Sequence, residues 1–275
     1  MYNSLTFMES VLKTLKGVAR RFVLWSFFVS KKIAPARIKS LIKGEIFKEW
    51  KDPYPAVARL LSELGVSEPV IIDGGAHFGK TIAKFRTYFP DARVYAFEPI
   101  RELADRLRGW NDAKLTVFNN ALGEREEALA FRVNKNSAAS SVYEPALIDE
   151  YYPETASMVE KISVDCVRID TLLHKRALSQ PDFIKLDLQG YELFALRGAQ
   201  ETLKDTKVVL LETEFVSLYK GQPLFHDIMK YLTEQGFQLF CFYDINHTPS
   251  GQIVYADAIF INKKYFGSNP SSHHV

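Results

Sequence analysis

Cysteine is scarce in this chain of 275 residues, which has only Cys166 and Cys241. Two cysteines cannot form the disulfide framework of a small secreted domain. Both lie in apolar, strand-like runs, so we expect buried thiols in a cytoplasmic protein. A long hydrophobic run is also missing, since the apolar stretch FVLWSFFV at 22–29 is well short of the roughly 20 residues that span a bilayer. Lys31 and Lys32 follow it instead of a small-residue cleavage site, so no secretory signal is predicted.

The chain has no large excess of charge of either sign: 35 Lys and Arg against 33 Asp and Glu give a net charge of +2. A nucleic-acid partner is therefore not expected. Residues 1–45 are nonetheless basic, with lysines and arginines set against only Glu9 and Glu45. Apolar residues between Val11 and Phe22 have helical spacing. We expect residues 8–33 to form a basic amphipathic helix that meets a membrane surface, a partner, the core of the protein or a second copy in a homodimer.

Sequence repeats and low-complexity tracts are absent too, and from residue 68 strand-like and helix-like segments alternate. The expected strands are 68–74, 92–99, 114–122, 181–189, 207–215, 237–245 and 253–262, with extra strands at 128–134 and 162–170. The expected helices between them are 79–89, 101–110, 192–203 and 226–236. This alternation predicts an α/β fold with a doubly wound, mostly parallel sheet, and the closing hairpin predicts one antiparallel strand at its edge.

The stretch IIDGGAHFGKTIAKF at 71–85 allows two interpretations. GGAHFGKT fits the P-loop pattern of ATPases and GTPases, in which a glycine-rich loop and a lysine hold phosphates. The lysine of the pattern would be Lys80 here. The same residues read as Asp73-x-Gly75-x-x-x-Gly79, a strand, turn and helix that can hold another nucleotide-like cofactor. Either ligand would bind beyond the carboxyl end of the first strand, where glycines let the backbone come close.

Glu98 separates these two interpretations. It closes the second expected strand, VYAFEP, about 20 residues after the loop, where a carboxylate can accept both hydroxyls of a ribose. A P-loop protein has no use for such a residue. The G-x-G-x-x-G pattern of dinucleotide sites is absent from the loop. The sequence therefore favours a nucleoside cofactor other than a dinucleotide.

Several motifs in order make the resemblance specific: IIDGGAHFGKT, VYAFEP, NNALGE, FIKLDLQGYELFALRGA, VVLLE, LYKGQPLF and YADAIFIN. Over residues 68–262 the chain resembles the FkbM family of S-adenosyl-L-methionine (SAM)-dependent methyltransferases. The resemblance implies the class I methyltransferase (Rossmann-like) sheet and SAM as cofactor. It places the cofactor on Asp73, Gly75, Ala76, Gly79, Glu98, Asn120 and Ala121.

Two residues depart from the pattern of the family. Where the family commonly shows Asp-x-Glu-Gly after its fourth strand, this chain has Asp187-Leu188-Gln189-Gly190. The missing carboxylate puts in doubt any role of that position in catalysis or metal binding. His77 stands where the family often has Asn, which is either local variation or an additional chemical group.

Methyl transfer to a hydroxyl needs alignment of the reactants and removal of a proton. We expect the catalytic residues to be Asp187, His77 and Glu212, with His77 as base and Asp187 orienting it or holding the acceptor. Other residues with both a structural and a functional interpretation are Glu192, Glu214, Tyr219, Gln222, His226 and the serine-rich segment 136–145, which either lines the acceptor site or is a connector. Asp187 and Glu212 could share a magnesium ion, but no third ligand is evident, and no metal site is predicted.

The function expected from these residues is O-methylation of a hydroxyl on a sugar, a glycan or a polyketide-like metabolite. The alternatives are a P-loop nucleotide-binding NTPase and a non-catalytic module with the SAM-binding fold. We expect a basic helical extension at 1–60, a SAM-binding methyltransferase domain at 61–265 and a disordered tail at 266–275. The expected location is the cytoplasm, with peripheral membrane contact through residues 8–33 as one option.

Overall fold

The computed structural model describes residues 51–151 and 157–267. The chain divides into two units by its contacts, of which Asp52–Ser268 contains all the helices and strands described below. The expected amphipathic helix at 8–33 and the tail beyond residue 267 lie outside the described residues. None of the described helices has the length and apolar character that crossing a membrane requires.

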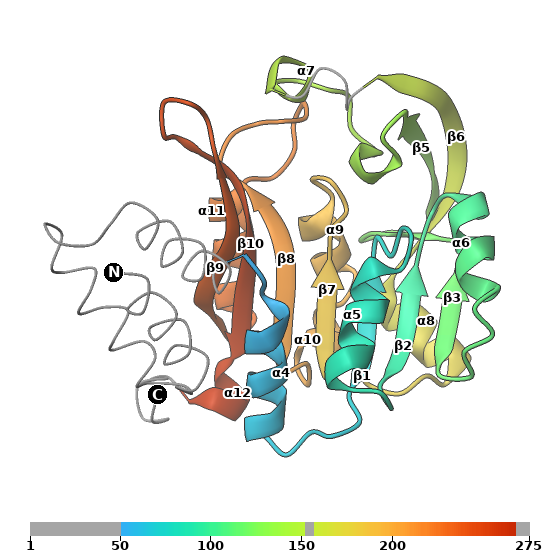
Figure 1. The fold of residues 1–275 in the computed structure, drawn as a ribbon, viewed down its shortest axis with the longest axis vertical. Helices are drawn as coiled ribbons and strands as arrows, with labels where there is room; N and C mark the ends of the chain where they lie inside the picture. Colours follow the sequence, from blue (N-terminus) through green and yellow to red (C-terminus); the bar gives the residue numbers. More distant parts are fainter. Residues whose placement is uncertain (1–50, 152–156, 268–275) are drawn as a thin grey trace, which may run out of the picture. The chain divides into compact units, whose positions relative to one another are not determined.

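A seven-stranded sheet forms the centre of the domain (Figure 1). Its strands lie in the order β3 (Leu115–Phe118), β2 (Arg93–Phe97), β1 (Val70–Gly74), β7 (Phe183–Leu186), β8 (Val208–Glu214), β10 (Ile253–Asn262) and β9 (Phe237–His247). The pairs from β3 to β8 are parallel, whereas β10 is antiparallel to both β8 and β9. The expected antiparallel strand is thus confirmed in the closing hairpin, where β10 lies inside and β9 is outermost.

Helices cover both faces of this sheet (Figure 1). One core packs α4 (Tyr54–Glu63), α5 (Lys80–Tyr88) and α6 (Arg101–Arg108) against one face. The other core packs α8 (Ile169–Arg176), α9 (Glu192–Arg197), α10 (Gln200–Leu203) and α11 (Phe225–Glu234) against the opposite face. The short α12 (Lys263–Phe266) follows β10, and its Phe266 joins the first core. The arrangement is the three-layer sandwich that alternating strands and helices predict.

Side-chain parity decides which strand residues reach each core. Ile71 and Phe183 enter the core of α4 and α5, whereas Ile72 and Ile184 enter the core on the other face. Successive side chains of a strand alternate between faces, so Asp73, two residues after Ile71, also points to the α4 and α5 side. The same parity places Lys185, Asp187, Glu212 and Glu214 on that side.

A smaller three-stranded sheet is inserted between β3 and β7, in the order β4 (Ala121–Leu122), β6 (Met158–Val167) and β5 (Glu127–Asn134). The 3-10 helix η1 (Ser137–Ala139) and the short α7 (Ile148–Tyr151) follow β5. In Figure 1 this insertion lies beyond the carboxyl ends of the main strands. The extra strands expected around the serine-rich segment are therefore present. Cys166 is buried as expected, but Cys241 is only partly buried because it lies on the edge strand β9.

Candidate cofactor and acceptor site

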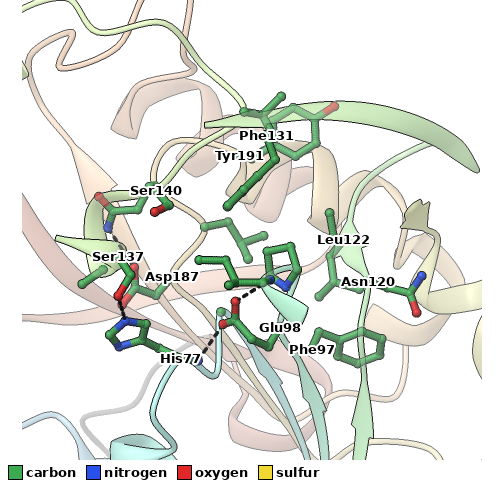
Figure 2. A pocket seen from close by; sticks show the side chains of 18 residues that line it. His77, Phe97, Glu98, Asn120, Leu122, Phe131, Ser137, Ser140, Asp187 and Tyr191 are labelled. Atoms are coloured by element: carbon green, nitrogen blue, oxygen red, sulfur yellow. Dashed lines mark hydrogen bonds between the residues drawn. The ribbon is translucent and has the colours of Figure 1, made fainter. Parts of the chain in front are cut away.

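A pocket that is partly open to solvent lies at the carboxyl ends of β1, β2 and β7. It is lined by Gly75, His77, Phe97, Glu98, Pro99, Ile100, Asn120, Ala121, Leu122, Phe131, Ser137, Ala138, Ser140, Val142, Asp187, Leu188, Gln189 and Tyr191. Figure 2 shows two ends: His77, Ser137 and Asp187 gather on one side, Asn120, Leu122 and Phe97 on the other, and Glu98 projects between them.

Four of the predicted cofactor residues line this pocket, namely Gly75, Glu98, Asn120 and Ala121. The other three, Asp73, Ala76 and Gly79, are not part of its lining. Gly75 and Gly79 both have φ near +75°, which glycine adopts without strain. A Cβ on Gly75 would lie 2.0 Å from the carbonyl oxygen of Asp187, so the loop after β1 is packed directly on the loop after β7.

The Glu98 carboxylate holds the glycine loop in place. Its Oε2 accepts a hydrogen bond from the backbone N–H of His77, and its Oε1 accepts one from the backbone N–H of Ile100, both at 2.8 Å. Burial raises the pKa of Glu98 to about 7, against the lowering effect of these two bonds. Each oxygen keeps one lone pair for another donor. A buried carboxylate in this position fits a ligand that supplies hydroxyl donors.

Asp73 takes part in a buried ion pair instead of lining the pocket. It stands directly opposite Lys185 on the neighbouring strand β7, and Lys185 Nζ lies 3.6 Å from Asp73 Oδ1 and 3.5 Å from Asp187 Oδ2. Burial opposes the charge on Lys185, but Asp187 and Asp73 outweigh it and raise the pKa of the lysine. Burial also raises the pKa of Asp73 to about 6. Lys185 therefore links the ends of β1 and β7 as their shared cation.

Gln189 connects the acids at the ends of β7 and β8. Its Nε2 donates to Asp187 Oδ1 at 2.9 Å and to Glu212 Oε2 at 2.7 Å. Its Oε1 accepts from the Tyr219 hydroxyl at 2.9 Å. Its backbone oxygen accepts from Ser141 Oγ at 2.8 Å, and its φ is +54°. A neutral amide can donate to two carboxylates at once, which an ionised Glu at this position could not do.

His77 lines the pocket with its imidazole beside the serine-rich segment. Its Nε2 lies 2.7 Å from Ser137 Oγ (Figure 2). Burial lowers the pKa of His77, with Asp187 acting in the opposite direction, so the ring is neutral near pH 7. The hydrogen bond of the ring thus goes to Ser137, whereas the sequence analysis offered Asp187 as a partner that could orient it. The serine-rich segment lines the pocket through Ser137 and Ser140, rather than serving only as a connector.

Acids accumulate behind Asp187, away from the pocket lining. Glu212 faces Asp257 across the β8 and β10 pair. Burial, then the charge of Asp187, raises the pKa of Glu212 well above its ordinary value, and burial raises the pKa of Asp257 to about 7. Glu214 is buried with its pKa also raised, first by burial and then by Glu192. Among the described residues, no group of three or more His, Cys, Asp or Glu is arranged to hold a metal ion.

The remaining candidates have mainly structural contacts. Glu192 is buried, and its Oε1 accepts from the backbone N–H of Leu188 at 2.5 Å, so it fastens the start of α9. Tyr219 is buried against Gln189, and Gln222 accepts a hydrogen bond from the backbone N–H of Tyr219. The side chain of His226 is 75% exposed beside Asp227.

Sequence reasoning missed Lys185 and the bridging role of Gln189. A lysine inside the apolar strand FIKL is the signal that could have identified the first, since a buried charge needs a partner. The bridge of Gln189 depends on side-chain geometry that no spacing in the sequence reveals.

The strand order β3-β2-β1-β7-β8-β10-β9, with β10 antiparallel, together with a pocket at the carboxyl edge, defines a class I SAM-dependent methyltransferase. The chain belongs to the FkbM methyltransferase family, because the family model described as "Methyltransferase FkbM domain" matches residues 73–239. Its cofactor is accordingly SAM.

Two characterised relatives are similar to this chain. One is the 2-O-methyltransferase NoeI of Sinorhizobium fredii, 28% identical over 175 residues that cover 60% of this chain and 71% of the relative. The other is the hexuronic acid methyltransferase AglP of Haloferax volcanii, 27% identical over 157 residues, covering 57% of this chain and 60% of the relative. The crystal structure of an FkbM methyltransferase from Methylobacillus flagellatus is 20% identical with a TM-score of 0.46, covering 79% of this chain and 50% of that one.

Proposed function

We propose that this chain methylates a hydroxyl of a sugar or glycan, with a polyketide-like metabolite as the second class of acceptor. The observation that carries the proposal is the polar end of the pocket. At that end the neutral imidazole of His77 and the carboxylate of Asp187 line the same cavity as the glycine loop and Glu98. Lys185 and Gln189 hold the Asp187 carboxylate in place. The name of NoeI supports a hydroxyl as acceptor, and the name of AglP supports a sugar-type acceptor.

Glu98 would hold the ribose hydroxyls through the lone pairs left on its carboxylate, with Gly75 beside the methionine part of the cofactor. Asn120 and Ala121 would border the adenine at the apolar end, where Phe131 and Tyr191 add aromatic surface. The cofactor carries the methyl group on a sulfonium. The neutral thioether that remains after transfer is a good leaving group for in-line displacement. The protein therefore contributes mainly alignment and the removal of a proton.

His77 is the group suited to take the proton of the acceptor hydroxyl. Burial keeps its ring neutral, and a neutral imidazole can accept a proton. Ser137, hydrogen-bonded to Nε2, fixes the orientation of the ring. Asp187 lies 3.5 Å from Lys185 Nζ and accepts a hydrogen bond from Gln189, and its role is to hold the acceptor hydroxyl. Glu212 acts through Gln189, because it lies outside the pocket lining.

Calorimetry with SAM and S-adenosylhomocysteine tests the cofactor site, and Glu98→Ala should weaken both strongly. Transfer of labelled methyl from SAM to a panel of hexosides, deoxyhexosides and hexuronides tests the acceptor class. Lys80 is exposed and outside the pocket lining, which disfavours the P-loop interpretation. Magnesium-dependent ATP or GTP binding that is lost in Lys80→Ala, without SAM binding, would contradict the proposal. SAM binding without transfer to any hydroxyl compound would indicate the non-catalytic module.

Membrane contact through residues 8–33 and a homodimer remain proposals that rest on the basic, amphipathic sequence of that segment. Flotation with anionic liposomes tests the first, and equal flotation after deletion of residues 1–45 would contradict it. Sedimentation of the full chain and of the same deletion tests the second.

A further inference from the structure

Two carboxyl groups and one imidazole are the side chains of the pocket lining that can carry charge near neutral pH. They are the carboxylates of Glu98 and Asp187 and the imidazole of His77, and no lysine or arginine is among the described residues of the lining. Burial keeps the imidazole neutral near pH 7. A cofactor with a sulfonium, an ammonium and one carboxylate carries a net positive charge and suits such a pocket. A second ligand that enters beside it meets the remaining negative charge.

Several hydrogen-bond donors at the polar end are already engaged. Lys185 is shared by Asp73 and Asp187, and both amide hydrogens of Gln189 are directed at Asp187 and Glu212. The Tyr219 hydroxyl donates to Gln189. An anionic group needs donors or a cation in order to be desolvated. The described residues at this end offer such a group few donors that are not already used.

Further acids lie behind Gln189 and Asp187, away from the pocket lining. Glu212 bonds to Gln189 from the rear, with Asp257 directly opposite it on β10 and Glu214 two residues along β8. Burial raises the pKa of both Glu212 and Glu214, and the next cause is the charge of Asp187 for Glu212 and that of Glu192 for Glu214. The fold thus places several carboxylates near the polar end with Lys185 as the neighbouring buried cation. A new negative charge there would add to an existing repulsion.

We propose that the acceptor carries no negative charge near the hydroxyl that receives the methyl group. It would be a neutral sugar or another uncharged hydroxyl compound, and not a uronate or a sugar phosphate. This inference rests on the proposed function and deepens it. It also predicts that the chain does not share the substrate class in the name of its relative, the hexuronic acid methyltransferase.

Two cofactor analogues test the inference without knowledge of the natural acceptor. Both are S-adenosylhomocysteine derivatives in which nitrogen replaces sulfur. One carries a 2-hydroxyethyl group and the other a carboxymethyl group in place of the transferred methyl. The cofactor pocket anchors both, and they differ in the charge that they present to the acceptor space. Calorimetry should show the hydroxyethyl analogue binding at least tenfold more tightly. Equal or tighter binding of the carboxymethyl analogue would overturn the inference.

Charge-removing variants identify the groups responsible. Asp187→Asn and Glu212→Gln should each narrow the difference between the analogues, whereas Glu201→Gln, an exposed acid on α10, should leave it unchanged. A difference that persists in full in both variants would contradict the assignment to these carboxylates. S-adenosylhomocysteine serves as the reference ligand, and its affinity in each variant reports an intact fold. If it does not bind the unaltered chain, the proposed function itself fails, which is distinguishable from failure of the charge inference alone.

Discussion

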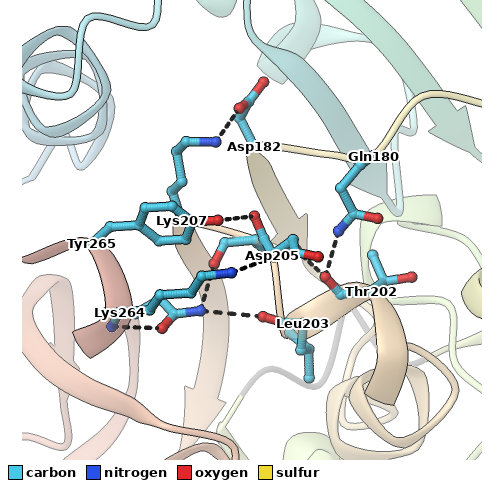
Figure 3. A network of polar contacts seen from close by, with 10 residues as sticks. Gln180, Asp182, Thr202, Leu203, Asp205, Lys207, Lys264 and Tyr265 are labelled. Atoms are coloured by element: carbon cyan, nitrogen blue, oxygen red, sulfur yellow. Dashed lines mark hydrogen bonds and ion pairs between the residues drawn. The ribbon is translucent and has the colours of Figure 1, made fainter.

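At the amino end of the parallel strands charged groups stand in pairs of opposite sign, whereas at the carboxyl end carboxylates gather around one lysine. Figure 3 shows the amino end, where Lys207 Nζ lies 2.6 Å from Asp182 Oδ1 and Lys264 Nζ lies 2.5 Å from Asp205 Oδ1. The Asn262 amide there donates to the carbonyls of Leu203 and Thr206. Each polar group of this network has a partner that suits it.

The carboxyl end lacks this balance. Lys185 serves two carboxylates, and Glu212 stands directly opposite Asp257 in the register of β8 and β10. Buried groups without matched partners cost stability. Perturbed carboxylates of this kind concentrate at functional sites. The comparison indicates that the polar groups at the amino end of the sheet stabilise the fold. Those at the carboxyl end cost stability, and they form the polar side of the pocket.

The largest expected effect is a loss of turnover when residues at the carboxyl end are substituted. Asp187→Asn and His77→Ala should each lower turnover at least about 100-fold, or roughly 2.7 kcal/mol in the activation barrier. They should leave SAM affinity within a few-fold, because neither supplies the ribose contact of Glu98. Methyl transfer to the acceptor found in the glycoside panel measures the first quantity and calorimetry the second. Unchanged turnover in both variants would remove their catalytic role and favour Glu212 or Glu214 instead.

Much of this comparison was within reach of the sequence. The alternation of strands and helices predicted the sheet, and the rule that ligands bind at carboxyl ends placed Glu98 at the pocket. The resemblance to the family added Asn120 and Ala121, which also line it. Parity could also have shown that Asp73 is buried, since it lies two residues after the core residue Ile71. The contacts of Gln189 and His77 could not be predicted, because they depend on which loops meet and on rotamers. The serine-rich insertion reaches His77 only through the folded second sheet.

The next largest effect concerns the amino end. Asn262 is buried, its amide donates to two carbonyls, and its Oδ1 accepts from the backbone N–H of Lys264. Asn262→Ala should lower the free energy of unfolding by about 2 to 3 kcal/mol, because buried partners lose their bonds. Urea denaturation measures this loss, and SAM affinity should not change. Asn246→Ala, at a more exposed amide on β9, is the matched control and should cost much less. A loss of SAM affinity in Asn262→Ala would break the division between the two ends.

A smaller effect is expected from pH. The pKa values of Glu98, Glu192 and Asp257 are raised to about 7 and that of Asp73 to about 6, chiefly by burial. The folded chain then binds more protons than the unfolded chain between about pH 4 and 7. The contribution of these four groups to stability is therefore greatest below this range and is lost as pH rises through their folded pKa values. The free energy of unfolding should be higher at pH 6 than at pH 8, by about 1 kcal/mol for each group whose folded pKa is near 7.

Urea denaturation at the two pH values measures this difference. Glu192→Gln should reduce it, since the amide oxygen can still accept from Leu188 while the titrating group is gone. Glu201→Gln, which removes an exposed acid, should leave the difference as it is. Higher stability at pH 8 than at pH 6 would mean that the acids at the carboxyl end are compensated in the folded chain, contrary to the contrast drawn here.

The smallest expected effect compares how much two ion pairs at the amino end contribute to stability. The Lys207 and Asp182 side chains are 20% and 19% exposed, and Asp182 also accepts from the backbone N–H of Val70. Lys207→Met should lower the free energy of unfolding by about 1 kcal/mol, because a partly buried carboxylate loses its cation. Lys264→Met should produce no measurable change, because its pair with Asp205 is exposed and screened by solvent. Denaturation midpoints at low and high salt measure both. Equal effects of the two substitutions would show that burial does not set the strength of these pairs, and the stabilising role of the amino end would then rest on Asn262 alone.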